Sequence, residues 1–274
     1  MMSAYPRHST AWLAAAAAAA IGLAGPADAQ LSGLTGGDEP IEIEAIDSLE
    51  WYSEEKMYVA RGDVVLRQGD TTLTADTVTA AYRELEDGST EIFKLTAEGN
   101  VVITSPDQTV TGATGVYDVD KAVFVMAGGD LKLVTPTETV TARDTLEYWE
   151  TQQLAVARGD AVAVRDDDRI QADELTAEFA DGPDGEQEMR RMGARGDVVI
   201  TTPSEVAHGD EGVYDVETGI ATLSGNVRLT QGDTQLNGDF AEVDMETGVS
   251  RLLSRSGGEG EGGGRIRGLL VPRD

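Results

Sequence analysis

The side chains that most often carry catalysis are scarce in this sequence. Its 274 residues include no cysteine and two histidines, His8 near the N-terminus and His208. Cysteine nucleophiles and cysteine-ligated zinc are therefore excluded, and a Ser-His-Asp triad would have to be built on His208. The sequence contains an internal repeat, described below, and the other copies have Thr, Gln or Asn at the position of His208. His208 is therefore expected to be an exposed strand residue. The sequence predicts a protein that is not an enzyme.

Carboxylates are abundant, but their spacing does not indicate a metal or catalytic site. The densest run, Asp166-Asp167-Asp168, lacks the spacing of an EF-hand or a calcium-binding nonapeptide. Other aspartates directly follow a glycine, which is typical of turns and bulges. We therefore expect no metal and no cofactor. The 50 acidic and 21 basic residues give a net charge of −29, which disfavours nucleic acid as a partner because its phosphates would be repelled.

A glycine followed by Asp or Asn recurs along the chain and defines an internal repeat. The six pairs begin at Gly62, Gly99, Gly129, Gly159, Gly196 and Gly225. The last three follow the first three with an offset of 97, 97 and 96 residues. Local matches agree, since the sequence VARGD occurs at 59–63 and again at 156–160. These features predict one domain built from six copies, with the second half duplicating the first.

Within each copy apolar and polar residues alternate, which is typical of strands with one face inward. Counted from the glycine, the second, fourth and eleventh following residues are apolar in all six copies, Ala161, Ala163 and Ala207 being the small ones. The larger ones are the candidate lining of an interior lipid-binding groove: Val64, Leu66, Leu73, Val101, Ile103, Val110, Leu131, Leu133, Val140, Ile170, Val198, Ile200, Val227, Leu229 and Leu236. The thirteenth residue is always Ala or Gly, which suits either tight packing or room between two sheets.

These patterns predict an all-β fold of about 12–16 antiparallel strands, two or more for each copy. We expect the domain to span residues 45–254, after a polar leader at 30–44 and before a flexible Gly/Glu-rich tail at 255–274. Residues 1–29 have the features of a cleavable signal peptide, with an alanine-rich run and cleavage between Ala29 and Gln30. This predicts export to the periplasm.

Several repeat segments resemble the OstA-like domain family of lipopolysaccharide transport proteins. They include AEGNVVIT at 97–104, GNVRLTQGDTQL at 225–236 and VYDVETGIA at 213–221. The resemblance covers about residues 45–253. Members of this family are the periplasmic LptA, the inner-membrane LptC and the N-terminal domain of the outer-membrane LptD. A cleavable signal and the lack of a transmembrane barrel favour an LptA-like member.

The resemblance implies an open, V-shaped β-jellyroll with two facing sheets that holds the acyl chains of lipid A. It also implies LptC-like and LptD-like partners and a head-to-tail homo-oligomer, joined through edge strands within Ile41–Tyr52 and Ala241–Leu253. A monomeric shuttle stays open as the alternative to a bridge. Two hypotheses from other classes also stay open: a closed β-solenoid that binds polysaccharide or acts as a scaffold, and a hydrolase with an unfamiliar site.

Overall fold

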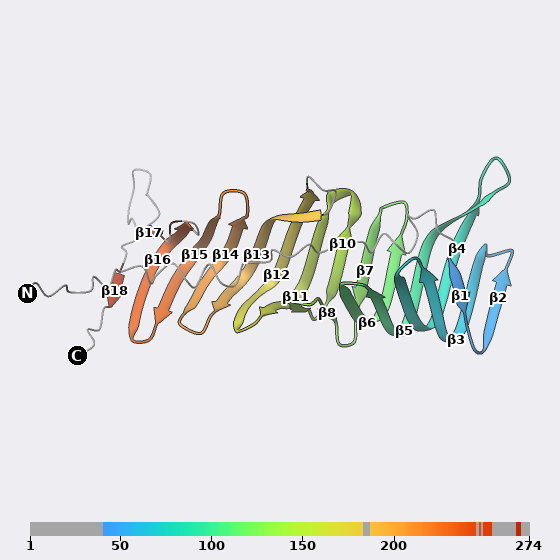
Figure 1. Cartoon of the computed structure of the whole chain (residues 1–274), viewed down its shortest axis with the longest axis horizontal. Helices are drawn as coiled ribbons and strands as arrows, with labels where there is room; N and C mark the ends of the chain where they lie inside the picture. Colours follow the sequence, from blue (N-terminus) through green and yellow to red (C-terminus); the bar gives the residue numbers. More distant parts are fainter. Residues whose placement is uncertain (1–40, 183–186, 245–246, 248, 254–266, 270–274) are drawn as a thin grey trace, which may run out of the picture.

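The computed structural model describes residues 41–182, 187–244, 247, 249–253 and 267–269, which form one elongated antiparallel sheet (Figure 1). The predicted signal peptide and its cleavage point between Ala29 and Gln30 lie outside these residues. The strands follow one another across the sheet, with one short 3-10 helix, η3 (Glu150–Gln152), before β11. The strands are β1 (Glu42–Glu44), β2 (Ser48–Tyr52), β3 (Met57–Gln68), β4 (Thr71–Glu84), β5 (Thr90–Ser105), β6 (Gln108–Asp118), β7 (Val123–Ala127), β8 (Lys132–Val134), β9 (Thr139–Thr141), β10 (Thr145–Trp149), β11 (Leu154–Arg165), β12 (Asp168–Asp181), β13 (Gln187–Thr201), β14 (Val206–Asp215), β15 (Ile220–Gln231), β16 (Thr234–Asp244), β17 (Val249–Leu253) and β18 (Arg267–Leu269).

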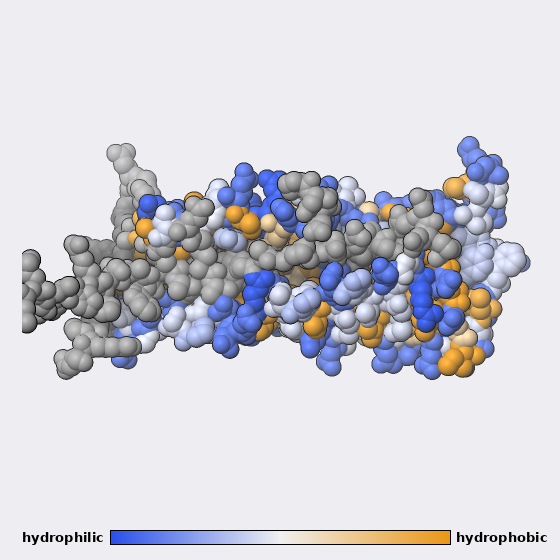
Figure 2. All heavy atoms as spheres, viewed as in Figure 1, coloured by the Kyte–Doolittle hydropathy of each residue, from blue (hydrophilic) through white to orange (hydrophobic). Residues whose placement is uncertain are grey.

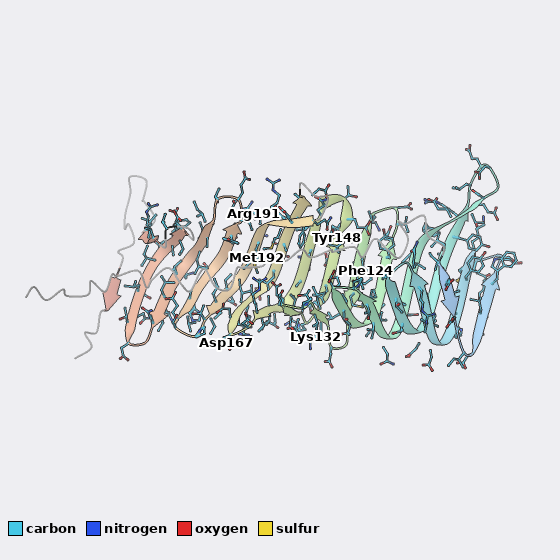
Figure 3. All side chains as sticks on the ribbon, in the orientation of Figure 1. Phe124, Lys132, Tyr148, Asp167, Arg191 and Met192 are labelled. Carbon is cyan, nitrogen blue, oxygen red and sulfur yellow. The ribbon has the colours of Figure 1, made fainter. Side chains whose placement is uncertain are left out.

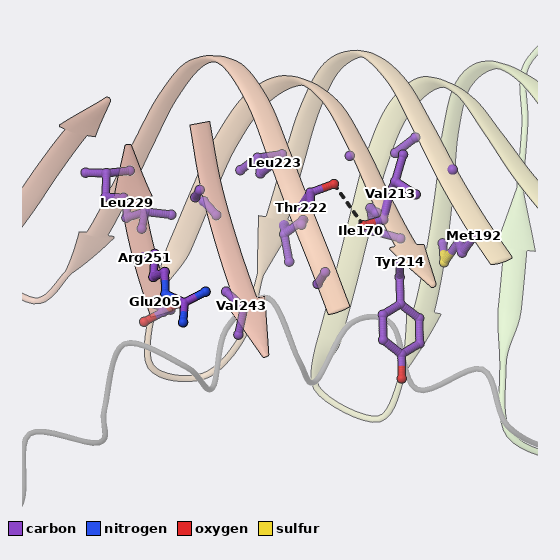
Figure 4. A pocket seen from close by; sticks show the side chains of 18 of the residues that line it. Ile170, Met192, Glu205, Val213, Tyr214, Thr222, Leu223, Leu229, Val243 and Arg251 are labelled. Atoms are coloured by element: carbon purple, nitrogen blue, oxygen red, sulfur yellow. Dashed lines mark hydrogen bonds between the residues drawn. The ribbon is translucent and has the colours of Figure 1, made fainter. Parts of the chain in front are cut away.

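Five of the six Gly-Asp and Gly-Asn pairs form β-bulges within the long strands β3, β5, β11, β13 and β15, whereas Gly129-Asp130 lies between the short strands β7 and β8. At one of them, Gly196 and Asp197 have φ of +79° and +46°, and the pairing register with β14 shifts between Arg195 and Val198. A bulge bends its strand, and Figure 4 shows the strands curving over so that their two halves face each other. This arrangement is the predicted open jellyroll, here with its two halves joined by continuous bent strands.

The bent strands leave two long edges of turns, which lie at the top and bottom of Figure 1. The upper edge contains the turns at 53–56, 85–89, 119–122, 150–153 and 216–219. The lower edge contains the turns at 69–70, 106–107, 135–138, 166–167, 202–205 and 232–233. We call the parts of the strands between the bulges and each edge the upper half and the lower half.

The bulge glycines are required by space as well as by their positive φ. A Cβ on Gly196 would lie 2.2 Å from the Oδ2 atom of Asp173 on the neighbouring strand. Gly99 and Asp76 have the same relation, at 2.1 Å, and the side-chain amide of Asn100 donates hydrogen bonds to Asp76. The repeated glycine therefore makes room for an aspartate that packs against the next bulge.

The described residues form 18 strands, more than the 12–16 predicted, because some strands are split at the bend. The lower-half piece β1 and the upper-half piece β2 both pair with β3. The upper-half piece β7 and the lower-half piece β8 both pair with β6. The pieces β9 and β10 share β11 in the same way, as β17 and β18 share β16. Counted as positions across the sheet, the 18 strands occupy fourteen, within the predicted range.

Two predicted domain boundaries differ from the structure. Strand structure begins at Glu42, inside the predicted leader, because Ile43 pairs with Leu66 and packs against the core. The predicted flexible tail contributes a strand, since Arg267–Leu269 pairs with Gln235–Asn237 of β16. These three residues fill the lower-half position that β17 leaves open beyond the bend. Residues 255–266 and 270–274 of the predicted tail lie outside the described residues.

The core lies between the two halves and runs through the whole sheet. One continuous cluster joins buried residues of the upper half, such as Ala60 and Val78, to those of the lower half, such as Val64 and Leu66. His208 is exposed on the outer face of β14, as predicted, while its neighbour Ala207 is buried. None of the described residues forms a helix long and apolar enough to cross a membrane.

Candidate lipid-binding groove

A large apolar cavity lies where the two duplicated units meet. Its volume is about 340 Å³, within the range of small-ligand sites. The first unit contributes β6 to β8 and the second contributes β9 to β13. Its apolar lining from the lower half is Val110, Leu133, Val140 and Ala163, and from the upper half it is Phe124, Leu146, Tyr148, Ala155, Val156, Ala157, Leu175, Ala177, Phe179, Met189 and Met192. Figure 3 shows Phe124, Tyr148 and Met192 in the central part of the sheet, from three different strands. We call this space the seam cavity.

Small residues in the fourth copy account for the hollow. At the fourth position after the bulge glycine this copy has Ala163, whereas the first and fifth copies have Leu66 and Ile200. Ala163 pairs with Val140 on one side and Ile170 on the other, and Ala163 and Val140 both line the cavity. Because van der Waals contact requires atoms on both sides, missing methyl groups leave an apolar void.

Aromatic and methionine side chains cover the upper half of the seam cavity. Tyr148 faces Phe124 across the seam, and its hydroxyl donates a hydrogen bond of 2.9 Å to Gln187 Oε1. Burial raises the pKa of Tyr148. Met189 and Met192 are flexible and polarizable, and such side chains adapt to ligands of irregular shape. This half of the cavity therefore suits apolar chains better than polar groups.

Charged groups stand at the rim of the seam cavity. On the lower edge Glu138 forms an ion pair with Arg165. Burial raises the pKa of Glu138, although the adjacent Arg165 acts in the opposite direction. Outside the cavity, in η3 on the upper edge, burial likewise raises the pKa of Glu150, whose Oε1 atom is buried without a hydrogen-bond partner in the described part of the chain.

On the outer face of the seam, the carboxylate of Glu147 accepts hydrogen bonds from three neighbouring side chains. Burial disfavours ionisation of Glu147, but hydrogen bonds from Thr145 (2.8 Å), Trp149 (3.0 Å) and Arg158 (2.9 Å) outweigh it and lower the pKa of this carboxyl. Glu50 in the first unit accepts equivalent bonds from Ser48 and Tyr52. Over the ranges that the structure describes, no three His, Asp or Glu side chains converge so that they could hold a metal ion.

A second apolar cavity, of about 60 Å³, lies in the second unit. Figure 4 shows Ile170, Met192, Leu223, Leu229 and Val243 around it. Glu205 and Arg251 also line it, so it too combines an apolar wall with charged groups. Met192 lines both cavities, which follow one another along the core. The groove therefore runs across the strands, along the long axis of the sheet.

All fifteen predicted groove residues face the interior, but they divide into two groups. Seven line one of the two cavities: Val110, Leu133, Val140, Ile170, Ile200, Leu229 and Leu236. The others pack in the closed core between the halves: Val64, Leu66, Leu73, Val101, Ile103, Leu131, Val198 and Val227. A role in binding lipid stays a prediction for both groups.

The sequence patterns missed the upper half of the groove. Phe124, Tyr148, Leu175, Phe179 and Met192 lie beyond the bend, where counting from the glycine no longer follows the strand faces. The signal that was present is the set of alanines in the fourth copy, which marks this segment as less filled than its equivalents.

The N-terminal end of the sheet differs from the seam in what covers it. In the seam, Leu146 and Tyr148 of β10 are 8% and 5% exposed, because β7 pairs with β10 and places Met126 and Phe124 beside them. The corresponding residues of β2 are Leu49 and Trp51, which share a face with Ala60 and Tyr58 but are 62% and 66% exposed. Figure 2 shows apolar atoms gathered at this end of the molecule, over β1 to β3. Among the described residues, the apolar interior is therefore uncovered at its N-terminal end.

Comparisons with known proteins identify the family of this chain. A family model described as "LptA/(LptD N-terminal domain) LPS transport protein" matches twice, over residues 42–153 and 139–249. An uncharacterized protein of Rhizobium meliloti (strain 1021) is 30% identical over 125 residues, covering 44% of this chain and 67% of that relative. Among solved structures, LptH, the LptA homologous periplasmic component of the lipopolysaccharide transport device from Pseudomonas aeruginosa, is 27% identical, with 44% of this chain and 83% of that chain covered and a TM-score of 0.37. Since the two family matches together span residues 42–249, the chain belongs to the family of lipopolysaccharide transport proteins that comprises LptA and the N-terminal domain of LptD.

Proposed function

We propose that this protein carries lipopolysaccharide through the periplasm and shields the acyl chains of lipid A in its groove. The observation that carries the proposal is the seam cavity, an apolar space of about 340 Å³ between the two units. Exposing one acyl chain of about a dozen methylenes to water costs on the order of 10 kcal/mol, at ~0.8 kcal/mol per methylene. An apolar groove offsets this cost without any chemical step, so the energy for directional transport must come from a partner.

Photo-crosslinking tests where the lipid lies. Phe179 lines the seam cavity and Trp149 lies on the outer face of β10, so each can be replaced by the photoreactive aromatic benzoylphenylalanine with little change in volume. We expect lipopolysaccharide to be captured at position 179 and not at position 149. Equal capture at both positions, or capture at neither, contradicts the proposed groove.

We further propose that the protein acts in a bridge, joined end to end with further copies and with LptC-like and LptD-like domains. The internal seam supplies the template, because there the split strands β7 and β8 pair with the split strands β10 and β9. Each end of the sheet also has a split strand, β1 and β2 at one end and β17 and β18 at the other. They run in opposite directions between the two edges, so joining the ends continues an antiparallel sheet.

Replacing Leu49 by Glu tests the end-to-end joint. Leu49 is 62% exposed, so the change should spare the fold while placing a charge in the joint. We expect light scattering to show oligomers that grow with concentration in the wild type and not in Leu49→Glu. Leu85→Glu, in an exposed turn of the upper edge, is the matched control. A wild-type protein that stays monomeric at high concentration, with no shift on adding an LptC-like domain, favours a shuttle instead.

A further inference from the structure

The interior of the sheet is chemically asymmetric between its two edges. In the upper half the inward side chains near the edge are aromatic, including Tyr117, Phe124, Tyr148 and Phe179. In the lower half, the last inward residues before the edge are polar beside the seam cavity. These residues are Ser105, Gln108, Glu138 and Arg165.

The polar residues at the lower edge are inward-facing and largely buried. The side chains of Glu138 and Arg165 are 14% and 22% exposed. Arg165 follows Ala163 by two residues on the inner face of β11, and Glu138 and Gln108 line the seam cavity. The Nε atom of Arg165 and the Oγ atom of Ser105 are buried without hydrogen-bond partners among the described residues. Buried polar atoms of this kind are rare in native proteins and require a partner, such as a ligand.

Two hydrogen bonds within the turn at 135–138 fix the position of Glu138. Thr135 closes this turn, since its backbone N–H donates to Glu138 O (2.9 Å) and its Oγ1 accepts from Glu138 N (3.1 Å). The same Thr-Pro-Ser/Thr-Glu sequence recurs at Thr202–Glu205, where Glu205 is 6% exposed and lines the second cavity. Both cavities therefore have a buried carboxylate set at the lower edge by the same kind of turn.

We propose that the lower edge of the seam cavity binds the neutral sugar part of the lipid headgroup through Gln108, Glu138 and Arg165. The inference rests on the proposed groove and adds an orientation to it: the sugar lies at the lower edge and the acyl chains lie under the aromatic upper half. Hydroxyl groups both donate and accept, and the amide, carboxylate and guanidinium together offer both functions. A phosphate fits less well, because Glu138 already neutralises Arg165 and Asp107 adds a further negative charge at this rim.

Two detergents with the same alkyl chain test the proposal, dodecyl maltoside with a neutral disaccharide and dodecylphosphocholine with a phosphate. Each is titrated below its micelle concentration, and its affinity is measured by displacement of a fluorescent lipid probe. We expect the full-length protein to bind the maltoside at least about tenfold more tightly, the effect of two additional hydrogen bonds. The double variant Glu138→Leu/Arg165→Met should lose this preference and keep its affinity for dodecylphosphocholine. Removing both charges together avoids leaving one buried without a partner.

Gln108→Leu provides a second variant without any change of charge, should the double variant fail to fold. It should reduce the preference for the maltoside severalfold. Arg169→Gln, at an exposed position on β12, should leave both affinities unchanged. Equal affinity of the wild type for the two detergents, or an unchanged preference in both the double variant and Gln108→Leu, overturns the headgroup site while the groove stands. If the wild type binds neither detergent, the proposed groove fails as well.

Discussion

Filling the seam cavity should stabilise the protein and weaken lipid binding at the same time. Ala163 lines the cavity, whereas all five other copies of the repeat have Leu or Ile at the equivalent position. Ala163→Leu adds about three methylene-sized groups to an existing apolar space, which is worth at most about 2 kcal/mol at ~0.8 kcal/mol each. For a domain of this size such a gain raises Tm by at most about 4–8 °C.

The matched control is Ala161→Leu, two residues earlier on the same face of the same strand. Ala161 is 0% exposed and does not line the cavity, so a leucine there has no space to enter. Overpacking of this kind destabilises by about 1–3 kcal/mol. The two substitutions are chemically identical, yet their effects on Tm should have opposite signs.

The binding assay decides whether the space is used by lipid. If the larger side chain of the Ala163→Leu variant displaces even two methylenes of an acyl chain, the affinity for lipopolysaccharide should fall about tenfold. Scanning calorimetry gives the change in Tm, and displacement of a fluorescent lipid probe gives the affinity. A stabilised Ala163→Leu variant with unchanged affinity would falsify the assignment of this cavity to acyl chains. A variant destabilised as much as Ala161→Leu would show that the cavity is not free space.

Three further predictions concern the bend, the upper-edge turn η3 and the groove wall. Gly196→Ala should destabilise by more than Gly88→Ala in thermal unfolding, because both have positive φ but only Gly196 has Asp173 in the place of the Cβ; equal losses would contradict the packing argument. Glu150→Gln should raise Tm at pH 7 and leave it unchanged below pH 4.5, because the raised pKa of Glu150 makes stability fall as pH rises from the ordinary value of 4.5 through the folded-state value. Glu86→Gln, at an exposed position, should leave Tm unchanged at both pH values. Leu133→Asp should abolish lipid binding and cost several kcal/mol because it places a charge in the groove wall, while its exposed neighbour Lys132→Asp should be tolerated; similar effects on lipid capture would refute the face assignment.

The repeat made much of the lower half predictable from the sequence. Each bulge glycine sets the start of a regular alternation, so residues such as Val64, Leu66 and Val198 could be assigned to the interior by counting. Five of the six pairs could be assigned to bulges, because a positive φ at both residues favours glycine followed by Asp or Asn. The sixth, Gly129-Asp130, lies instead between the short strands β7 and β8.

The inward-facing residues of the upper half could not be predicted by the same count. On β4 the buried apolar residues are Leu73, Ala75, Val78 and Tyr82, so the alternation changes phase where Asp76 faces two bulges. A count carried through the bend from the glycine therefore assigns the wrong face. The pairing of β18 with β16 was also out of reach, because three residues after a long Gly/Glu-rich stretch carry no periodic signal.

The duplication has a consequence for how a bridge of such units is held together. The fourteen strand positions, at about 4.8 Å each, make a sheet about 60–65 Å long in one chain. Its central joint, between β7 and β10 and between β8 and β9, is intramolecular, so its formation does not depend on protein concentration. In the proposed bridge, only the joints at the two ends would depend on it. A bridge of a given length built from this chain therefore needs about half as many concentration-dependent joints as one built from single units, and the cavity best suited to lipid lies at the joint that cannot dissociate.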